Sequence, residues 1–455
     1  MEKRRGCAIS FIFGLLFSLL LIVVSFFAIY FWLKLKSFEP QIVFHYVPPE
    51  RSFIYSQEEF LQFGIEDSLK ETVIAEREKL IKSKKSFIDV DLQKMELTLY
   101  KEGEKFKVFP IQAKGAEWFW GETPPGLYSV EFKAPLLFST AANAWMPYAI
   151  QFYGNYFIHG WPYTPAGTPI SSRHSGGCIR LLTKDASFLF EFAEKGMPIL
   201  VFDEKICSPL PALIPVGEKF LPPQINAQAI LIADLDTGEV ILSKEMNSEI
   251  YAGPAVTVMF ALVASENVNL EKRIVAKTWM FEGIKEGFIT PGKSYRGDEL
   301  LRILISKPSK EATMVLSRFL TPERFVEQMN KKAKAIGMKN TNFEDILGIS
   351  ENNVTTLYDV ARMMRYIKNY RKFILEMNET LVGPGGNETQ TILAVLKMYY
   401  DKNIPNSDTS NEISQDSIRF IFIGIANSSD PNKDLNNILI WLENNFNLKK
   451  IESKI

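Results

Sequence analysis

The feature that most constrains this chain is a long uncharged run near its start. Residues 8–33 contain no Asp, Glu, Lys or Arg and are rich in Phe, Leu, Ile and Val. At a rise of about 1.5 Å per residue, a helix of this length spans a hydrocarbon core of roughly 30 Å. A cleaved signal peptide would have a shorter apolar run, of about 7–15 residues. The run therefore predicts a retained transmembrane helix, with cleavage as the alternative.

The charges that flank this run predict its orientation. Lys3, Arg4 and Arg5 precede it, whereas Lys34 and Lys36 follow it. Basic residues accumulate on the cytoplasmic side of a membrane span. We therefore expect residues 1–7 to be a cytoplasmic tail of a single-pass protein of the cell (inner) membrane. The rest of the chain would then lie outside the cytoplasm, in a periplasmic or extracytoplasmic position.

The overall composition limits the class of protein. The chain has 455 residues, enough for two or three domains, and its 52 basic residues are matched by 53 acidic ones. This balance gives no indication of nucleic-acid binding. Its three cysteines are too few for a disulfide framework. Cys178 and Cys207 are able to pair in principle, but the surroundings of Cys178 favour a free thiol.

The chain after the membrane span divides into four predicted segments. Residues 34–85 begin with prolines and continue with Ser56-Gln57-Glu58-Glu59, a capping box that predicts a helix in a stalk. Residues 86–202 contain short alternating strands separated by Gly and Pro turns, which indicate a mostly-β sandwich or barrel with one short helix. A proline-rich linker follows at 203–225. Residues 226–446 combine strand and helix patterns and predict an α/β (α+β) domain.

One loop of the β-rich segment has the residues for nucleophilic chemistry. Residues 157–182, FIHGWPYTPAGTPISSRHSGGCIRLL, hold His159, His174 and Cys178. A cysteine becomes a nucleophile when a nearby histidine or backbone dipoles stabilise its thiolate. The glycines at 176 and 177 let backbone N–H groups converge on a developing oxyanion. His159, at the end of a strand, is then the candidate base.

Each of these residues has a simpler interpretation. A cysteine beside glycine is usually a small buried hydrophobe, and a single histidine is more often a structural hydrogen-bonding residue than a base. A zinc site would need another ligand besides two histidines and a cysteine, and no nearby His-x-x-x-His or Cys-x-x-Cys supplies one. We therefore expect no metal and no cofactor.

Residues 86–202 resemble the catalytic domain of the L,D-transpeptidases. The family signature is a histidine followed further along by Ser/Thr-His-Gly-Cys, or a close variant, and then Ile/Val-Arg. Here His159-Gly160 is followed by Ser175-Gly176-Gly177-Cys178-Ile179-Arg180. Residues 122–128, ETPPGLY, are similar to the family's Thr-Pro-x-Gly turn, and residues 87–115 are similar to its first hairpin.

The chain departs from the signature at one position. Many members have a histidine two residues before the nucleophile, where this chain has Gly176, and His174 lies four residues before Cys178. We interpret His159 as the base and His174 as a bystander or substrate-facing residue. The departure puts only a supporting contact in doubt.

The resemblance implies acyl transfer on peptidoglycan stem peptides. Cys178 would attack the third-position diamino acid of a tetrapeptide, release D-alanine and form a thioester, with His159 as proton donor and acceptor. The amine of a second stem would then form a cross-link, or water would hydrolyse the thioester in an L,D-carboxypeptidase reaction. The N–H groups of Gly177 and Cys178 would form the oxyanion hole. Five further residues are expected to support the loop or contact substrate: Ser175, Gly176, Arg180, Trp161 and Tyr153. For Arg180, a structural salt bridge is an equal alternative, and for the aromatic residues a place in the core.

Residues 226–446 resemble serine-type D-alanyl-D-alanine carboxypeptidases, which have the penicillin-binding transpeptidase fold. The similar stretches include AILIADLDTGEVILSKEMN at 229–247 and VMFALVASE at 258–266. At the expected Ser-x-x-Lys, however, the chain reads Pro254-Ala255-Val256-Thr257, and Ser309-Lys310-Glu311 stands at the Ser-x-Asn element. No Lys-Thr-Gly or Lys-Ser-Gly triplet occurs in 380–430. We therefore expect this domain to be a pseudoenzyme.

The sequence as a whole predicts a transferase of cell-wall biogenesis, with a role in peptidoglycan synthesis and cell shape. Its first domain would be the active L,D-transpeptidase. Its second domain would bind stem peptides or other cell-wall proteins, or would position the first. A non-enzymatic wall-binding scaffold is the remaining alternative. The presence together of His159, Ser175, Gly177, Cys178 and Arg180 argues against it.

Overall fold

A computed structural model describes residues 68–116, 121–172, 174–203, 213, 222–377, 390–400, 418–446 and 448–450. All of these residues belong to one compact unit, Phe53–Ile455. The predicted membrane span, the capping box at Ser56 and most of the linker lie outside the described residues, as does Cys207. Within the described ranges, no helix has the length and apolar character needed to cross a bilayer.

The first described element, helix α2, packs against the rest of the protein. It covers Ser68–Lys82, and Leu69, Val73 and Leu80 on one of its faces are buried. Arg77 forms an ion pair with Asp89 at 2.7 Å. This part of the predicted stalk therefore does not stand free, because its apolar face lies in the main hydrophobic core.

The β-rich domain contains two sheets and one helix. The first sheet has the order β3-β2-β1-β9-β4 and the second has the order β5-β6-β7-β8. The strands of the first sheet are β1 Phe87–Asp91, β2 Glu96–Lys101, β3 Glu104–Pro110, β4 Gly126–Ser129 and β9 Pro198–Phe202. Those of the second are β5 Phe132–Ser139, β6 Ala144–Tyr153, β7 Tyr156–His159 and β8 Ile179–Arg180, and helix α3 covers Thr183–Phe192. The prediction of a β-rich domain with a short helix is confirmed.

The pairing of β7 with β8 brings together residues that are far apart in the chain. β6 and β7 form an antiparallel hairpin, and β8 pairs parallel to β7, with Ile158 opposite Ile179 and His159 opposite Arg180. Their inward side chains join a core cluster with Ile88, Val90 and other strand residues. This core holds the loop between β7 and β8 at one edge of the sheet.

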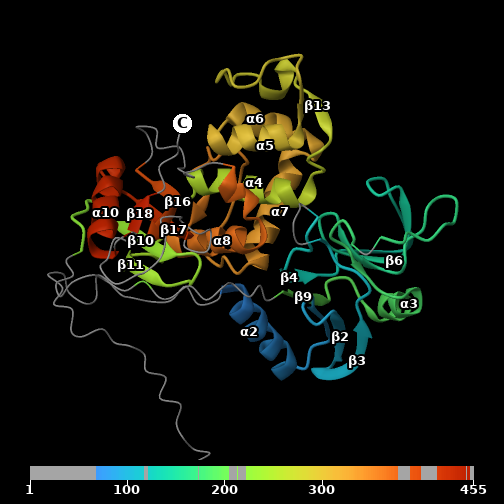
Figure 1. Ribbon diagram of the computed structural model, residues 1–455. Helices are drawn as coiled ribbons and strands as arrows, with labels where there is room; N and C mark the ends of the chain where they lie inside the picture. Colours follow the sequence, from blue (N-terminus) through green and yellow to red (C-terminus); the bar gives the residue numbers. More distant parts are fainter. Residues whose placement is uncertain are drawn as a thin grey trace, which may run out of the picture. The chain divides into compact units, whose positions relative to one another are not determined.

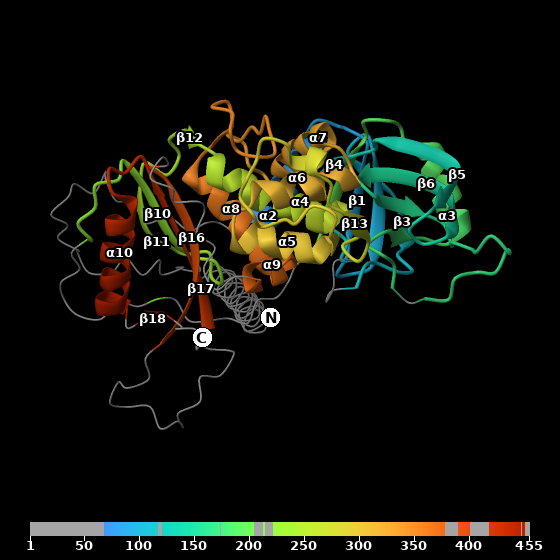
Figure 2. The same cartoon turned by 90° about the horizontal axis from the view of Figure 1, so that it is seen from above.

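The second domain is built on an antiparallel sheet of order β11-β10-β17-β16-β18. In Figure 2, α10 covers one face of this sheet, and α8 and α4 lie on the other. The strands are β10 Ala229–Asp234, β11 Val240–Lys244, β16 Ile392–Tyr400, β17 Ile418–Ala426 and β18 Leu448–Lys450. The helices are α4 Gly253–Asn267, α5 Gly297–Ser306, α6 Lys310–Leu316, α7 Pro322–Ala335, α8 Leu357–Tyr370, α9 Phe373–Glu376 and α10 Pro431–Phe446. Smaller elements are the pairs β12 Ile250–Tyr251 with β15 Val354–Thr355 and β13 Arg273–Val275 with β14 Ser294–Arg296, and the 3-10 helices η1 Thr278–Phe281 and η2 Ser317–Phe319. The predicted α/β class is confirmed (Figure 1).

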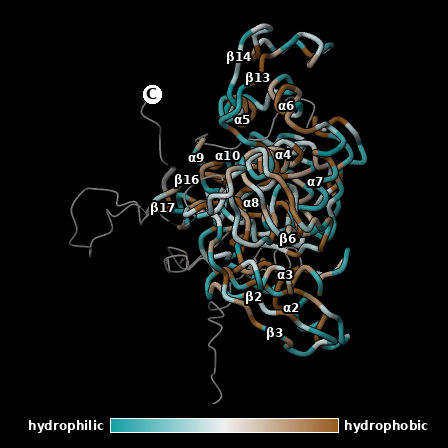
Figure 3. The backbone as a smooth tube through the Cα atoms, turned by 90° about the vertical axis from the view of Figure 1, so that its right-hand side faces the viewer, coloured by the Kyte–Doolittle hydropathy of each residue, from teal (hydrophilic) through white to brown (hydrophobic). Residues whose placement is uncertain are grey.

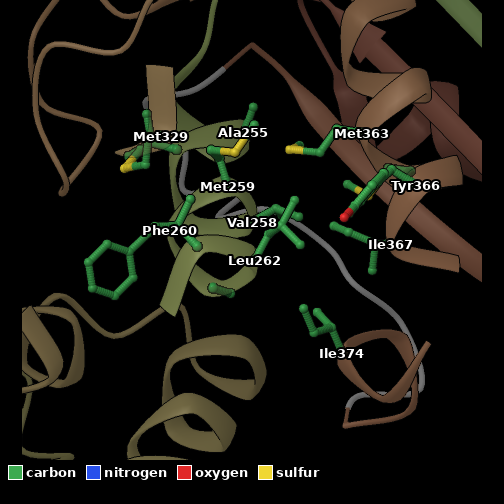
Figure 4. Packing of buried hydrophobic residues seen from close by; sticks show 14 of the residues in the cluster. Ala255, Val258, Met259, Phe260, Leu262, Met329, Met363, Tyr366, Ile367 and Ile374 are labelled. Atoms are coloured by element: carbon green, nitrogen blue, oxygen red, sulfur yellow. The ribbon is translucent and has the colours of Figure 1, made fainter. Parts of the chain in front are cut away.

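Helix α4 lies at the centre of this domain. Nearly all of its side chains are buried, as expected for a helix that is apolar on every face. Figure 4 shows Met259 and Leu262 of α4 among side chains of neighbouring elements, including Met329 of α7 and Met363 of α8. Other helices are amphipathic, and hydrophobic and hydrophilic residues alternate along the backbone in Figure 3. The core that surrounds α4 continues into the β-rich domain, because Phe87, Tyr100 and Leu200 belong to the same cluster.

Candidate active site

The two residues predicted to form a dyad lie on neighbouring strands. Cys178 immediately precedes β8, and His159 ends β7. The parallel register places His159 opposite Arg180, so residue 178 falls beside residue 157 of β7. Because side chains alternate between the faces of a sheet, residues 157, 159, 178 and 180 all project to the same face. The fold therefore brings the thiol and the imidazole to one face of the sheet.

His159 is held in a defined tautomer. The residue is buried, and its Nδ1 lies 2.6 Å from the carbonyl oxygen of Gly160. A carbonyl only accepts, so Nδ1 carries the proton and donates it, which leaves Nε2 with a free lone pair. Burial, helped by the charge of Arg180, lowers the pKa of His159 to about 4, although the hydrogen bond to the Gly160 carbonyl opposes the shift. At neutral pH the ring is therefore an uncharged base.

Cys178 is a neutral thiol in the resting structure. The residue is partly exposed, but its sulfur is packed against protein atoms, with Sγ 3.9 Å from the carbonyl oxygen of Asn155. This desolvation raises the pKa of Cys178 to about 11, against the opposing effects of the Phe157 backbone and the Arg180 charge. Among the described residues no hydrogen bond joins Cys178 to His159. Proton transfer to Nε2 therefore has to accompany the attack of the sulfur, and such contacts often tighten only when substrate binds.

The turn before Cys178 is closed by the Ser175 hydroxyl. Ser175 Oγ donates to the carbonyl oxygen of Cys178 at 2.5 Å and accepts from the N–H of Gly177 at 3.1 Å. The N–H of Gly177, predicted to form part of the oxyanion hole, is therefore engaged in the resting state. It has to leave the Ser175 hydroxyl before it is able to bind an oxyanion.

Gly177 and Gly176 differ in what surrounds them. Gly177 has a φ of +107°, and a Cβ there would lie 2.2 Å from Cε1 of Tyr156. Gly176 is exposed, and a Cβ there would meet nothing within 4 Å. Glycine is therefore required at position 177, where both the positive φ and the neighbouring ring exclude a side chain, and not at position 176. The position where many L,D-transpeptidases have histidine is open.

Thr123 holds the same turn in place through two hydrogen bonds of its hydroxyl group. Its Oγ1 donates to the carbonyl oxygen of Gly177 at 2.8 Å and accepts from the N–H of Gly115 at 3.0 Å. Thr123 belongs to the ETPPGLY stretch, which the sequence singled out without assigning this residue a function. Its position in that turn was the signal that could have identified it.

The other predicted site residues have different environments. Arg180 is buried and donates through Nη1 to the carbonyl oxygen of Ser172 at 2.8 Å, so it orders the loop. His174 is exposed, and its backbone hydrogen-bonds with Ser172. Trp161 is half-buried, and its backbone N–H donates to the hydroxyl of Thr183.

Tyr153 was expected to contact substrate or, as the alternative, to lie in the core, and the structure places it in the core. Its side chain is fully buried, and its hydroxyl accepts from Nδ2 of Asn267 at 3.1 Å. Asn267 ends α4 of the second domain. Tyr153 also stacks against Tyr128 and Tyr156, with ring centroids 5.2 and 6.0 Å apart. Docking of the second domain covers a strand position that the sequence alone leaves undecided between core and surface.

The described residues offer no candidate metal centre, since they contain no cluster of three or more His, Cys, Asp or Glu side chains suited to hold an ion. Cys178 is a free cysteine. The arrangement is that of a thiol, a neutral imidazole and a glycine turn, which together suit acyl transfer through a thioester.

Two family models match this chain. The L,D-transpeptidase catalytic domain (YkuD) matches residues 85–201, and D-alanyl-D-alanine carboxypeptidase (Peptidase_S11) matches residues 217–381. The chain joins an L,D-transpeptidase domain to a domain of the D-alanyl-D-alanine carboxypeptidase family. Both resemblances seen in the sequence are thereby confirmed.

Curated relatives match through about a third of this chain. The D-alanyl-D-alanine carboxypeptidase DacF of Bacillus subtilis is 28% identical over 154 residues, which are 32% of this chain and 40% of DacF. A D-alanyl-D-alanine endopeptidase of Escherichia coli is 27% identical over 153 residues, which are 32% of this chain and 49% of the relative. The chain thus spans less than two thirds of the length of either relative. Among solved structures, an L,D-transpeptidase from Stackebrandtia nassauensis is 25% identical, with 27% of this chain and 58% of that chain covered and a TM-score of 0.23.

In the carboxypeptidase-family domain, the residues that the sequence places at the family's catalytic elements have structural contacts. Pro254 is buried in the first turn of α4. Ser309 caps α6, since its Oγ accepts from the N–H of Ala312 and donates to Glu286 at 2.8 Å. The Glu311 carboxylate accepts four backbone N–H groups, from residues 286–289. These side chains are already engaged within the protein.

Proposed function

We propose that this protein is a membrane-anchored L,D-transpeptidase that cross-links peptidoglycan stem peptides through a Cys178 thioester. The observation that carries the proposal is the pair on one face of β7 and β8, a partly exposed thiol and an uncharged histidine whose Nε2 is free to accept a proton. The match of residues 85–201 to the L,D-transpeptidase model supports the substrate class.

In the first half-reaction, Sγ of Cys178 attacks the carbonyl carbon of the third residue of a tetrapeptide stem. Nε2 of His159 takes the thiol proton as the carbon–sulfur bond forms. The oxyanion is stabilised by the N–H of Cys178, together with that of Gly177 once it leaves Ser175. When the carbon–nitrogen bond breaks, His159 returns the proton to the departing D-alanine amine.

In the second half-reaction, the side-chain amine of another stem attacks the thioester carbonyl. His159 accepts a proton from this amine, the carbon–sulfur bond breaks, and the thiol is restored. Water in place of the amine would give an L,D-carboxypeptidase, which is the alternative outcome of the same site. The acceptor alone distinguishes the two reactions.

The deciding experiment incubates the purified full chain, wild type and Cys178→Ala, with disaccharide-tetrapeptide and follows the products by mass spectrometry. Cross-linked dimer that disappears in the variant supports the transpeptidase. Tripeptide without dimer supports the carboxypeptidase. Unchanged substrate with the folded wild-type protein contradicts both and leaves the wall-binding scaffold. A carbapenem is expected to form an adduct on Cys178, and peptide mapping locates it.

We further propose that the carboxypeptidase-family domain is not itself catalytic. The structural contacts of Ser309 and Glu311, and the proline in place of the nucleophile, support this. It would serve as a binding or positioning module for stem peptides or for other cell-wall proteins. Fluorescent penicillin should leave the Cys178→Ala chain unlabelled, and labelling of that variant would show that the domain is active.

The proposed membrane anchor rests on the sequence of residues 8–33. In cells, the full chain should fractionate with the inner membrane and be protected from protease added to the cytoplasmic side. Recovery in the soluble fraction would contradict the anchor without affecting the proposed chemistry.

A further inference from the structure

The boundary between the two domains contains a buried polar cluster. Its members are charged or phenolic side chains, all of them buried except Tyr128, which is partly buried. The L,D-transpeptidase domain contributes Glu122, Tyr128, Tyr153 and Tyr156, and the carboxypeptidase-family domain contributes Glu266, Lys332, Tyr366 and Arg371. Charges buried at this depth are normally paired, and loss of one partner leaves another uncompensated.

Ion pairs and hydrogen bonds connect the members of the cluster. Lys332 pairs with Glu266 at 2.9 Å and donates to the Tyr366 hydroxyl at 2.7 Å. Lys332 also donates to the Tyr128 hydroxyl of the other domain at 3.3 Å. Arg371 pairs with Glu266 at 3.2 Å. The cluster thus ties α4, α7 and α8 to the β-rich domain.

Arg371 connects the cluster to Glu122, the residue that precedes Thr123. It follows α8, and its side chain is almost completely buried. Nη1 lies 3.2 Å from Oε2 of Glu122, and Nη2 lies 3.1 Å from the backbone carbonyl oxygen of the same residue. The planar guanidinium therefore holds both the side chain and the main chain of Glu122, a geometry that a lysine ammonium would not reproduce.

Two routes lead from Arg371 to Gly177. The first runs through Glu122 to Thr123, the next residue, whose hydroxyl donates to the Gly177 carbonyl at 2.8 Å. The second runs through Tyr156, whose ring lies against Gly177, so closely that a Cβ on this glycine would be 2.2 Å from Cε1. Burial raises the pKa of the Tyr156 phenol, and the charge of Arg371 opposes that rise. Arg371 therefore contacts Glu122 directly, and its charge acts on Tyr156, which lies against the residue that precedes the nucleophile.

We propose that Arg371, from the carboxypeptidase-family domain, is a positioning residue of the L,D-transpeptidase site. By holding Glu122, whose neighbour Thr123 binds the Gly177 carbonyl, it fixes the turn that presents the Cys178 thiol and the backbone N–H groups. The second domain thereby holds part of the first domain's active site in position. This inference rests on the proposed transpeptidase function.

The test compares full-chain variants in steady-state cross-linking and in the rate of Cys178 acylation by a carbapenem. Arg371→Met is expected to lower kcat about 10- to 100-fold, because small displacements of reacting groups are costly. Its KM should change by less than about 3-fold, because the lost interaction does not touch bound substrate. Arg371→Lys retains the positive charge but lacks the planar guanidinium that reaches two groups of Glu122. Its kcat should lie between those of Arg371→Met and wild type.

Lys331→Met is the matched control. Lys331 of α7 forms another ion pair across the same boundary, with Glu131 at 3.0 Å, and has no contact with Gly177 or its neighbours. If Arg371 acts only by joining the domains, the two variants should affect kcat alike. We expect Lys331→Met to stay within about 2-fold of wild type, as for a partly exposed pair.

Thermal unfolding of each variant separates loss of fold from loss of positioning. A folded Arg371→Met chain with wild-type kcat and acylation rate overturns the proposal. If that variant does not fold, Glu122→Gln decides, with an expected decrease in kcat of about 3- to 10-fold and wild-type kcat as the contradicting result. A wild-type chain that neither processes tetrapeptide nor reacts with carbapenem overturns the proposed function instead.

Discussion

The two domains treat their catalytic positions in opposite ways. In the L,D-transpeptidase domain, Nε2 of His159 is left free by the Nδ1 hydrogen bond to Gly160, and Sγ of Cys178 has only a weak contact with the Asn155 carbonyl at 3.9 Å. In the carboxypeptidase-family domain, Ser309 caps a helix and Glu311 binds four backbone N–H groups. This difference is what we expect if the first domain is active and if the polar groups of the second have taken structural roles, as proposed above.

The largest expected effect tests the availability of the base. His159→Gln keeps a polar side chain but cannot accept the thiol proton, and kcat for cross-linking should fall about 10²- to 10⁴-fold. His174→Gln is the control, since His174 is exposed and the hydrogen bonds that it makes with Ser172 come from its backbone. Steady-state kinetics should show wild-type rates for this control. Equal losses in both variants would contradict the assignment of His159 as the base.

The next effect concerns the turn that presents the nucleophile. Gly177→Ala places a methyl group against the Tyr156 ring at a φ of +107°, so both fold and loop are strained. We expect a loss of about 2–4 kcal/mol in the free energy of unfolding and a strongly reduced kcat. Gly176→Ala meets open space and should change stability by less than about 0.5 kcal/mol. Denaturant unfolding measures both, and equal stabilities would show that the turn tolerates side chains at either position.

A substitution in the other domain sharpens the comparison. Glu311→Gln removes the charge that accepts four N–H groups and should lower the free energy of unfolding by about 1.5–3 kcal/mol. Cross-linking per folded molecule should stay unchanged, because Glu311 does not contact the thiol loop. Stability is measured by chemical denaturation and activity by product formation. Unaltered stability would mean that Glu311 is not the structural anchor we describe.

The smallest effect is expected from pH. His159, with a pKa of about 4, and Cys178, with a pKa of about 11, are both uncharged across the range between these values. Carbapenem acylation of Cys178 should therefore be nearly constant from about pH 6 to 9 and fall only as His159 is protonated near pH 4. Because the pKa of His159 is lower in the folded than in the unfolded chain, the unfolded chain binds a proton on this residue at a higher pH. The free energy of unfolding should therefore decline as pH falls below about 6.5. A steep rise of the acylation rate between about pH 6 and 8 would contradict the conclusion that His159 and Cys178 are both uncharged in this range.

Much of the architecture followed from local pattern. Alternation of apolar and polar residues predicted the strands of 86–202, and the signature residues predicted which histidine lies beside the thiol. The paired strands bring His159 and Cys178 to one face, because alternation along neighbouring strands depends only on register. The placement of Tyr153 could not be predicted, since a strand residue of this kind is equally suited to a cleft or a core until the covering domain is known.

The sequence by itself determined the two domain types and the proline at position 254, and it predicted the pair of His159 and Cys178, because each depends on residue identity or short-range spacing. Only the tertiary structure decided that Ser175 holds the Gly177 N–H, that α2 packs into the core, and that Arg371 reaches Glu122. Arg371 and Glu122 are 249 positions apart in the chain. A contact over that separation depends on how two folded domains pack, and no local periodicity or motif encodes it.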